Sequence, residues 1–158
     1  MTDATELREK FWKHLDSDRT VMLCADGVPP RPMTAMREDE SGPIWFFTSI
    51  ETEMGQASEK GRTLSAVMML TSKNHELFAS AVGQLKQDND RTVIDALWNP
   101  FIAAWFSGKD DPKLRLLRFE PEQAEVWENA NSLFAGIKLL LGVDPKKDFK
   151  DQAKKIAL

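Results

Sequence analysis

Cysteine, long hydrophobic runs and an excess of positive charge are all scarce in this chain of 158 residues. The single cysteine, Cys24, excludes a disulfide within the chain and is typical of a reducing compartment. The longest apolar runs, such as residues 44–47 and 67–70, are far too short to cross a bilayer, so no membrane partner is expected. The first residues, MTDATELREK, are acidic and polar where a secretory signal is apolar, so we expect a cytoplasmic protein.

Charge and sequence motifs exclude further classes of protein. The 21 basic residues are outnumbered by 25 acidic ones and form no basic stripe, so we expect no nucleic-acid partner. His14 and His75 lie far apart and Cys24 has no second ligand at a suitable spacing, so no metal site is expected. The chain also lacks a G-x-S-x-G motif and a P-loop, and the sequence therefore assigns no catalytic residue.

The length and composition indicate one globular domain over residues 1–158. A chain of this size buries a substantial core, and no repeat, low-complexity stretch or long linker divides it. Helical spacing of apolar residues predicts an N-terminal helix with Thr2 or Asp3 as its N-cap. The apolar face of this helix is expected to consist of Leu7, Phe11, Trp12 and Leu15.

Short apolar runs predict a mainly β chain with helices around it. Five strands are expected first, with a short helix over 52–60 after the third of them. One or two helices over 88–106 follow, with a break at Pro100, and then two more strands. A helical C-terminal tail is expected from Asn131 onward. The expected strands cover residues 19–25, 31–38, 43–49, 63–70, 77–86, 114–121 and 123–128.

The order of these elements predicts an antiparallel barrel. Strands at close spacing with few helices between them favour a Greek-key or meander barrel over a parallel α/β sheet. Closure of such a barrel would also remove exposed strand edges. Gly83 interrupts the strand at 77–86, and a glycine in that position is typical of a bulge or a close backbone approach.

Three polar residues on neighbouring strands form the candidate site that residue types alone suggest. Arg31 lies in RPMTAM, and Thr48 and Ser49 end WFFTS, just before the turn IETEMGQ. Arginine offers a forked, charge-assisted contact and the hydroxyls offer further donors, so the three can converge on one anion. Strand–turn–helix junctions often hold phosphate. Each residue also has an alternative role: Arg31 in an ion pair at the barrel rim, and Thr48 and Ser49 in a helix cap.

Together these stretches resemble the FMN-binding split barrels related to pyridoxamine 5'-phosphate oxidase, and above all the general stress protein 26 family. The resemblance covers nearly the whole chain and rests on RPM, WFFTS, LWNPFIAAWF and DDPKLRLLRFEPEQAEVWE. It implies a mainly β fold with peripheral helices, in the form of a six-stranded antiparallel split barrel. It also implies a homodimer with one FMN in each of two clefts between the subunits.

The resemblance implies which residues hold the FMN. Residues 31–33 would line the isoalloxazine ring and the ribityl chain, and residues 47–49 would lie toward the phosphate. Trp105, or Trp98 in its place, would reach the flavin of the partner subunit. With one residue of the turn added, the implied cofactor-binding set is Arg31, Pro32, Met33, Phe47, Thr48, Ser49, Met54 and Trp105.

The turn after WFFTS departs from the family pattern. The oxidases carry an Arg-Lys pair where this chain has Glu53 and Met54, so Met54 stands in place of a phosphate-binding lysine. A charge-assisted contact is worth about 1.5–3 kcal/mol, and a loss of ~3 kcal/mol weakens binding about a hundredfold. Lys60 and Arg62 are near enough in sequence to compensate. The site is expected to be either a weakened FMN site or an empty one.

Three functions are compatible with these observations. The first is an FMN-dependent oxidoreductase of the stress-response type, whose substrate, electron donor and electron acceptor the sequence does not identify. The second is a non-catalytic protein that holds FMN or another small anionic or aromatic ligand, and the third is an interaction domain without a ligand. Oxidation of pyridoxamine 5'-phosphate is not expected, because LLLGVDPKKDFKDQAKKIAL lacks the Arg-x-His segment with which the oxidases act on that substrate.

Overall fold

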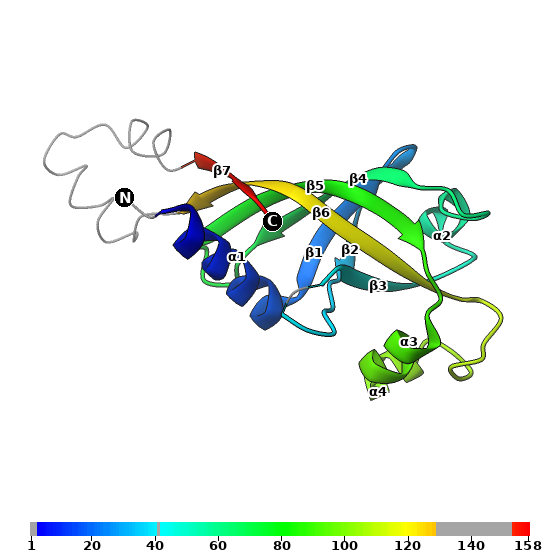
Figure 1. Ribbon diagram of the computed structural model, residues 1–158. Coiled ribbons are helices and arrows are strands. Elements are labelled where there is room, and N and C mark those ends of the chain that lie inside the picture. Colours follow the sequence, from blue (N-terminus) through cyan, green and yellow to red (C-terminus); the bar gives the residue numbers. More distant parts are fainter. Residues whose placement is uncertain (1–2, 41, 129–152) are drawn as a thin grey trace, which may run out of the picture.

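Strands dominate the described part of the chain (Figure 1). The computed structural model describes residues 3–40, 42–128 and 153–158. Within these residues the helices are α1 (Ala4–Asp18), α2 (Glu53–Ala57), α3 (Arg91–Leu97) and α4 (Pro100–Ala103). The strands are β1 (Thr20–Ala25), β2 (Val28–Thr34), β3 (Ile44–Ser49), β4 (Leu64–Thr71), β5 (Leu77–Gln87), β6 (Leu114–Glu128) and β7 (Ala153–Ala157).

The N-terminal helix α1 forms where the spacing of apolar residues predicted it. Asp3 is its N-cap, and the carboxylate of Asp3 accepts a hydrogen bond from the backbone N–H of Glu6 at 2.9 Å. The helix ends at Arg19, which adopts a left-handed conformation with φ of 60°. The apolar face of α1 packs into the main core through Leu7, Phe11 and Leu15.

All the strands pair antiparallel, which confirms the mainly β prediction. They form one seven-stranded sheet in the order β2-β1-β4-β5-β6-β3, and β7 also pairs with β6. No strand ladder among the described residues closes this sheet into a complete barrel. A single bridge between Met36 and Trp45 links the chain after β2 to β3, with backbone bonds of 3.0 and 2.7 Å. The count of seven strands differs from the six that the resemblance implied.

The two strands expected over 114–121 and 123–128 are one long strand, β6. Pro121 does not end this strand, because the β5–β6 pairing shifts register between Val82 and Gly83 and accommodates the proline opposite Gly83. The close approach that Gly83 predicted is present: a Cβ at this position would lie 2.1 Å from the carbonyl oxygen of Glu120. Figure 1 shows the resulting β6 crossing the length of the sheet.

The prediction of a helical C-terminal tail is wrong for the last residues of the chain. Residues 153–157 form β7, which pairs with β6 from Gln123 to Trp127. Ile156 of β7 is buried in the main core. The strand forms because β6 supplies its backbone hydrogen bonds, and the apolar spacing of residues 153–157 alone does not indicate this distant partner. The rest of the predicted tail, residues 131–152, lies outside the described residues.

The buried side chains of the described residues form two hydrophobic clusters. The main core lies between α1 and the inner face of the sheet, with Phe11, Phe46 and Phe119 among its fully buried members. The second cluster lies where α3 packs on the adjoining ends of β3 and β6, and it includes Trp45 and Leu116. This second cluster holds α3 beside β3, and Figure 1 shows α4 next to α3. Among the described residues, no helix is both long and apolar enough to cross a membrane.

Candidate functional site

The candidate site lies at the end of β3, where the chain turns into α2. Thr48 and Ser49 are the last residues of β3, and α2 begins at Glu53. Arg31 comes from β2, and its register partner Leu23 has a fully buried side chain, so Arg31 lies on the inner side of the sheet. Arg31 therefore reaches the start of α2, where it meets Glu53, and Thr48 and Ser49 end the strand that leads into the same turn.

The helix α2 packs directly onto the end of β3 because residue 55 is glycine. A Cβ at Gly55 would lie 2.0 Å from the carbonyl oxygen of Ser49, which is far inside van der Waals contact. On the other side, Gln87 holds α2 through its side-chain amide, which donates to the carbonyl oxygen of Gly55 at 2.9 Å and to the hydroxyl of Ser58 at 3.1 Å. The position of α2, and of Glu53 at its start, is therefore fixed from both sides.

The hydroxyls at the turn bond to one another. Thr52 is the N-cap of α2, and its hydroxyl accepts the backbone N–H of Gly55 at 2.9 Å. The same hydroxyl donates to the carbonyl oxygen of Ser49 at 2.9 Å. The hydroxyl oxygens of Thr48 and Thr52 lie 2.8 Å apart. The Thr48 hydroxyl is the donor of this bond, because the Thr52 hydroxyl already donates its proton to Ser49. The helix-cap alternative is thus correct in part: the cap is Thr52, and Thr48 supports it.

Arg31 forms an ion pair with the first residue of α2. Its Nη2 lies 3.0 Å from Oε2 of Glu53, and the side chains are 28% and 64% exposed respectively. The Nε of Arg31 is buried, and no described residue accepts a hydrogen bond from it. The ion-pair alternative for Arg31 therefore holds in this structure, yet one donor of the guanidinium stays available for a ligand atom.

A second acid of the turn, Glu51, pairs with a cation that the sequence analysis did not find. Nζ of Lys113 lies 2.8 Å from Oε1 of Glu51, and this carboxylate raises the pKa of the lysine. The backbone N–H of Ile50 also donates to the carbonyl oxygen of Lys113 at 2.9 Å. Lys113 reaches the turn because β3 and β6 pair with Ser49 opposite Leu114, a register that local sequence patterns do not indicate.

The other predicted site residues lie in different environments. Met33 packs against the main core, whereas Pro32 is exposed on the outer side of β2. Phe47 is half-buried, and its ring meets Trp98 edge-on with centroids 6.3 Å apart. Trp105 is 84% exposed just beyond α4, away from the packed core of its own chain.

Met54 does not face the surface at the turn. Its side chain is fully buried in the main hydrophobic core, while the neighbouring Glu53 extends to Arg31. A lysine at position 54 would therefore place an unpaired charge in the core, at a high energetic cost. Glu53, and not Met54, is therefore the residue of α2 that meets Arg31. Lys60 and Arg62, considered as compensating cations, are exposed in the loop beyond α2.

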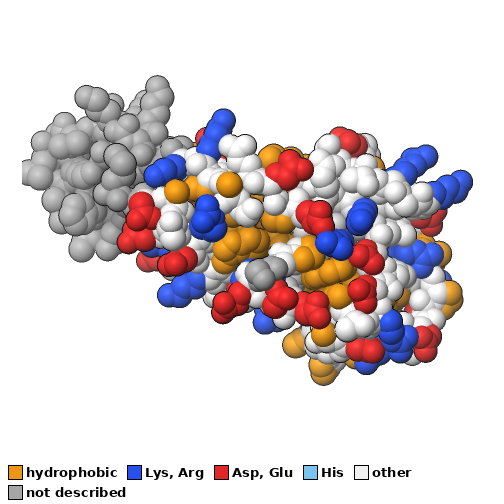
Figure 2. Space-filling view, viewed as in Figure 1, with side chains coloured by type: hydrophobic (Ala, Val, Ile, Leu, Met, Phe, Trp, Pro, Cys, Tyr) orange, Lys and Arg blue, Asp and Glu red, His pale blue; other side chains and the backbone are white. Residues whose placement is uncertain are grey.

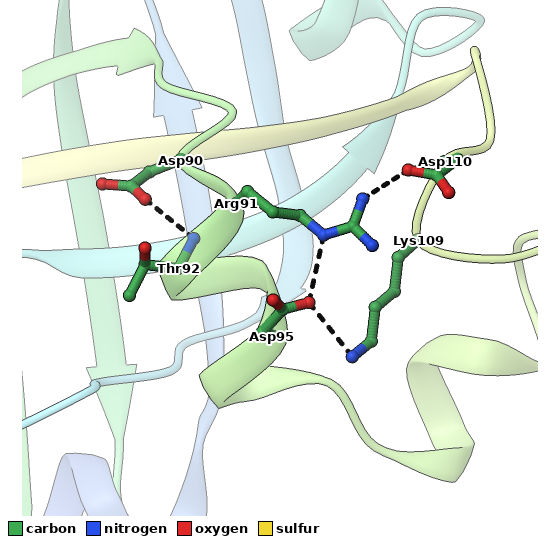
Figure 3. Close-up of polar contacts among 6 residues, drawn as sticks. All are labelled: Asp90, Arg91, Thr92, Asp95, Lys109 and Asp110. Atoms are coloured by element: carbon green, nitrogen blue, oxygen red, sulfur yellow. Dashed lines mark hydrogen bonds and ion pairs between the residues drawn. The ribbon is translucent and has the colours of Figure 1, made fainter.

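A network of charges fixes the segment that carries Trp105 (Figure 3). Asp95 on α3 accepts contacts of 3.1 Å from both Lys109 and Arg91, and these two cations, Lys109 foremost, lower the pKa of Asp95. Arg91 also pairs with Asp110, which raises the pKa of the arginine. Arg91, Asp95 and Asp110 are solvent-exposed and Lys109 is half-buried, so the network orients the loop after α4 and contributes little stability of its own.

In the same loop, the carboxylate of Asp111 is expected to stabilise the folded protein less in acid than at neutral pH. The backbone N–H groups of Ser107 and Lys113 each donate to the Asp111 carboxylate at 2.9 Å, and they hold its pKa below the ordinary value. The unfolded chain therefore binds a proton more readily than the folded one. This stabilisation is complete above about pH 5 and is lost progressively as the pH falls through the lowered pKa. Denaturant unfolding between pH 7 and pH 2.5 should show a smaller acid loss for Asp111→Asn. Parallel profiles for the variant and the wild type would contradict this assignment.

A hollow among the described residues lies elsewhere. It has a volume of about 640 Å³ and lies between α1, the turn after β4 and the end of β6. Its charged walls balance, with three lysines against three carboxylates, so it offers no net attraction for an anion. The charged residues are Lys10, Lys13, Lys73, Asp18, Glu76 and Glu128.

Comparison with known families gives one match over most of the chain. The family model described as "Pyridoxamine 5'-phosphate oxidase like" matches residues 6–147. General stress protein 26 of Bacillus subtilis (strain 168) is 29% identical over 80 residues, which are 50% of this chain. The chain spans about 57% of the length of that relative.

Several solved structures are similar to this chain. A general stress FMN/FAD binding protein from Xanthomonas citri is 48% identical, with a TM-score of 0.74 over 80% of this chain and 92% of that one. A putative general stress family protein from Xanthomonas campestris pv. campestris is 50% identical, with a TM-score of 0.74 over 83% and 92%. A putative general stress protein 26 from Jannaschia sp. CCS1 is 26% identical, with a TM-score of 0.79 over 98% of both chains.

Proposed function

Because this chain belongs to the pyridoxamine 5'-phosphate oxidase-like family, we propose that it is a flavin-binding protein of the stress-response type that holds FMN beside Arg31 and the end of β3. The observation that carries the proposal is the contact of Arg31 with Glu53 at the start of α2, just after Thr48 and Ser49 end β3. The Xanthomonas citri relative, described as an FMN/FAD binding protein, supports a flavin as the ligand.

The residues present fit an anionic ligand. The buried Nε of Arg31 has no acceptor among the described residues, so a ligand oxygen would satisfy it. Arg31 would hold the polar side of the flavin by charge-assisted hydrogen bonds, and Met33 and Phe47 would offer apolar contacts. The Ser49 hydroxyl accepts the backbone N–H of Glu51 at 3.2 Å. Its proton has no acceptor among the described residues and could be donated to a phosphate oxygen. When bound, FMN would supply the redox chemistry of an oxidoreductase.

A non-catalytic binding protein is the second candidate, and the Arg31–Glu53 contact favours it. This contact of 3.0 Å occupies a cation that a phosphate would use, and it would therefore weaken a phosphate site there. A protein that holds a flavin or another small ligand loosely, without turning over a substrate, would have this property. Neither candidate is a true pyridoxamine 5'-phosphate oxidase, because the Arg-x-His segment is missing from the sequence.

The absorption spectrum of freshly purified protein separates these candidates. A yellow protein that NAD(P)H bleaches supports the oxidoreductase, and a yellow protein that NAD(P)H leaves unchanged supports the binding protein. A colourless protein that does not respond to added FMN contradicts both, and leaves an interaction domain without a ligand.

The protein is further proposed to act as a homodimer in the cytoplasm. Phe101 and Trp105 are each 84% exposed near α4, and hydrophobic side chains are visible at this end of the molecule in Figure 2. Met22 and Val82 are also exposed on the outer side of the sheet, and Val82 lines a hollow of about 380 Å³ there. Exposed apolar surface of this kind is typical of an interface. Trp105 projects from its own chain, and it would contact the flavin held by its partner.

The double variant Phe101→Ser, Trp105→Ser is expected to weaken dimerisation about tenfold, because exposed aromatic anchors commonly dominate interfaces. Analytical ultracentrifugation at micromolar concentration should give twice the chain mass for the wild type and a lower average mass for the variant. Arg62→Ser, an exposed substitution in the loop beyond α2, serves as the control. A wild-type protein that sediments with the mass of one chain would overturn the homodimer.

A further inference from the structure

We propose that Glu53 competes with the ligand's phosphate for Arg31, and that this competition sets the preference of the site between phosphorylated and unphosphorylated flavins. The inference rests on the proposed function, since it concerns the same site. It goes further by assigning a role in ligand selection to an acidic residue of the chain itself.

The geometry of the Arg31–Glu53 pair suits an exchangeable contact. Only one oxygen of Glu53 meets one nitrogen of Arg31, at 3.0 Å, so the carboxylate does not engage the guanidinium in a two-point contact. Glu53 is 64% exposed at the rim, while Arg31 is 28% exposed and has its Nε buried. The arginine is therefore the fixed partner, and the carboxylate is the one that can rotate into solvent.

A phosphate can accept hydrogen bonds from the donors of Arg31 that Glu53 leaves unused. The guanidinium offers Nη2, now taken by Glu53, and Nε, which lacks an acceptor among the described residues. A phosphate group carries several acceptor oxygens and close to two negative charges, so it gains more from Arg31 than a single carboxylate oxygen does. It must displace Glu53 to do so, and the two anions repel each other if Glu53 stays.

The other acid of the turn provides an internal comparison. Glu51 pairs with Lys113 at 2.8 Å, on the side of the turn where β3 meets β6. Glu51 and Glu53 are thus separated by one residue, have similar exposure and hold different cations. Separate variants that remove the charge of Glu51 or of Glu53 distinguish competition at Arg31 from a general effect of negative charge near the ligand.

The test measures FMN and riboflavin affinities by quenching of flavin fluorescence. We expect Glu53→Gln to tighten FMN binding about fivefold at low salt, because the weak surface pair no longer competes. Riboflavin, which lacks the phosphate, should change less than twofold. Glu51→Gln should change both affinities less than twofold. The gain for FMN should shrink at 0.5 M NaCl, because salt screens exposed charges.

A double variant ties the effect to Arg31. In an Arg31→Met background, Glu53→Gln should change FMN affinity less than twofold, since the contested cation is gone. Equal gains for FMN and riboflavin, equal gains from Glu51→Gln and Glu53→Gln, or an undiminished gain in the Arg31→Met background would each overturn the competition while leaving the flavin site intact. Saturable binding of neither flavin by any variant would overturn the proposed function, and the competition with it.

Discussion

Gly55→Ala is expected to destabilise the protein by about 3 kcal/mol and to weaken the proposed flavin binding further. The added Cβ would lie 2.0 Å from the carbonyl oxygen of Ser49, and this neighbour is backbone of β3, which cannot rotate away. The helix α2 would have to move off the strand, taking with it the N-cap at Thr52 and the position of Glu53. Urea unfolding followed by tryptophan fluorescence measures the change.

Gly108→Ala is the matched control for this substitution. A Cβ at Gly108 meets nothing within 4 Å, and the residue does not require a positive φ. Its free energy of unfolding should therefore stay within about 0.5 kcal/mol of the wild-type value. A wild-type stability for Gly55→Ala would show that α2 does not rest on the end of β3 as the structure places it.

Arg31→Ala is expected to weaken FMN binding at least tenfold without unfolding the protein. Ten-fold corresponds to about 1.4 kcal/mol, which is at the low end of what a charge-assisted hydrogen bond contributes. Loss of the side chain leaves Glu53 unpaired, but Glu53 is 64% exposed and water will solvate it. Equilibrium titration with FMN gives the affinity, and far-UV circular dichroism checks that the variant is folded.

Arg62→Ala removes the same charge from the loop beyond α2 and serves as the control for Arg31→Ala. Arg62 is exposed, and the sequence made it a candidate to compensate for the missing basic residues of the turn. Its removal should change FMN affinity less than twofold. If Arg62→Ala weakens binding as much as Arg31→Ala does, the phosphate lies toward that loop and the assignment of Arg31 is wrong.

The sequence predicted the fold well where local patterns decide it. The apolar spacing of α1, the alternation along the strands and the glycine at the β5 bulge each act within a few residues, and each is confirmed. The family resemblance, read from RPM, WFFTS and the later aromatic motifs, is also confirmed. The errors concern pairing between distant segments. Pro121 stays within β6, and residues 153–157 add a strand, because partners far along the chain supply the hydrogen bonds.

The candidate site could be predicted only in part for a similar reason. The motifs predicted that Arg31, Thr48 and Ser49 lie near one turn, but no local pattern shows which side chain of a turn faces inward. The family pattern drew attention to Met54, but Met54 is buried in the core. The neighbouring Glu53 is the residue whose charge meets Arg31.

The sequence analysis did not predict Lys113 as a residue of the turn, because the register of β3 against β6 brings it there. That register depends on side chains packed along the whole of both strands, including Phe46 opposite Leu117 and Ile44 opposite Phe119. A prediction of this pairing from sequence would have placed residues 113–115 beside the end of β3.

A crystal structure of the protein grown with FMN tests the central claim most directly. We predict one FMN for each chain, with its phosphate within hydrogen-bond distance of Arg31 or of the Ser49 hydroxyl, and with the Glu53 carboxylate displaced from Arg31. FMN bound away from the end of β3, or crystals that hold no FMN despite saturating ligand, would contradict it.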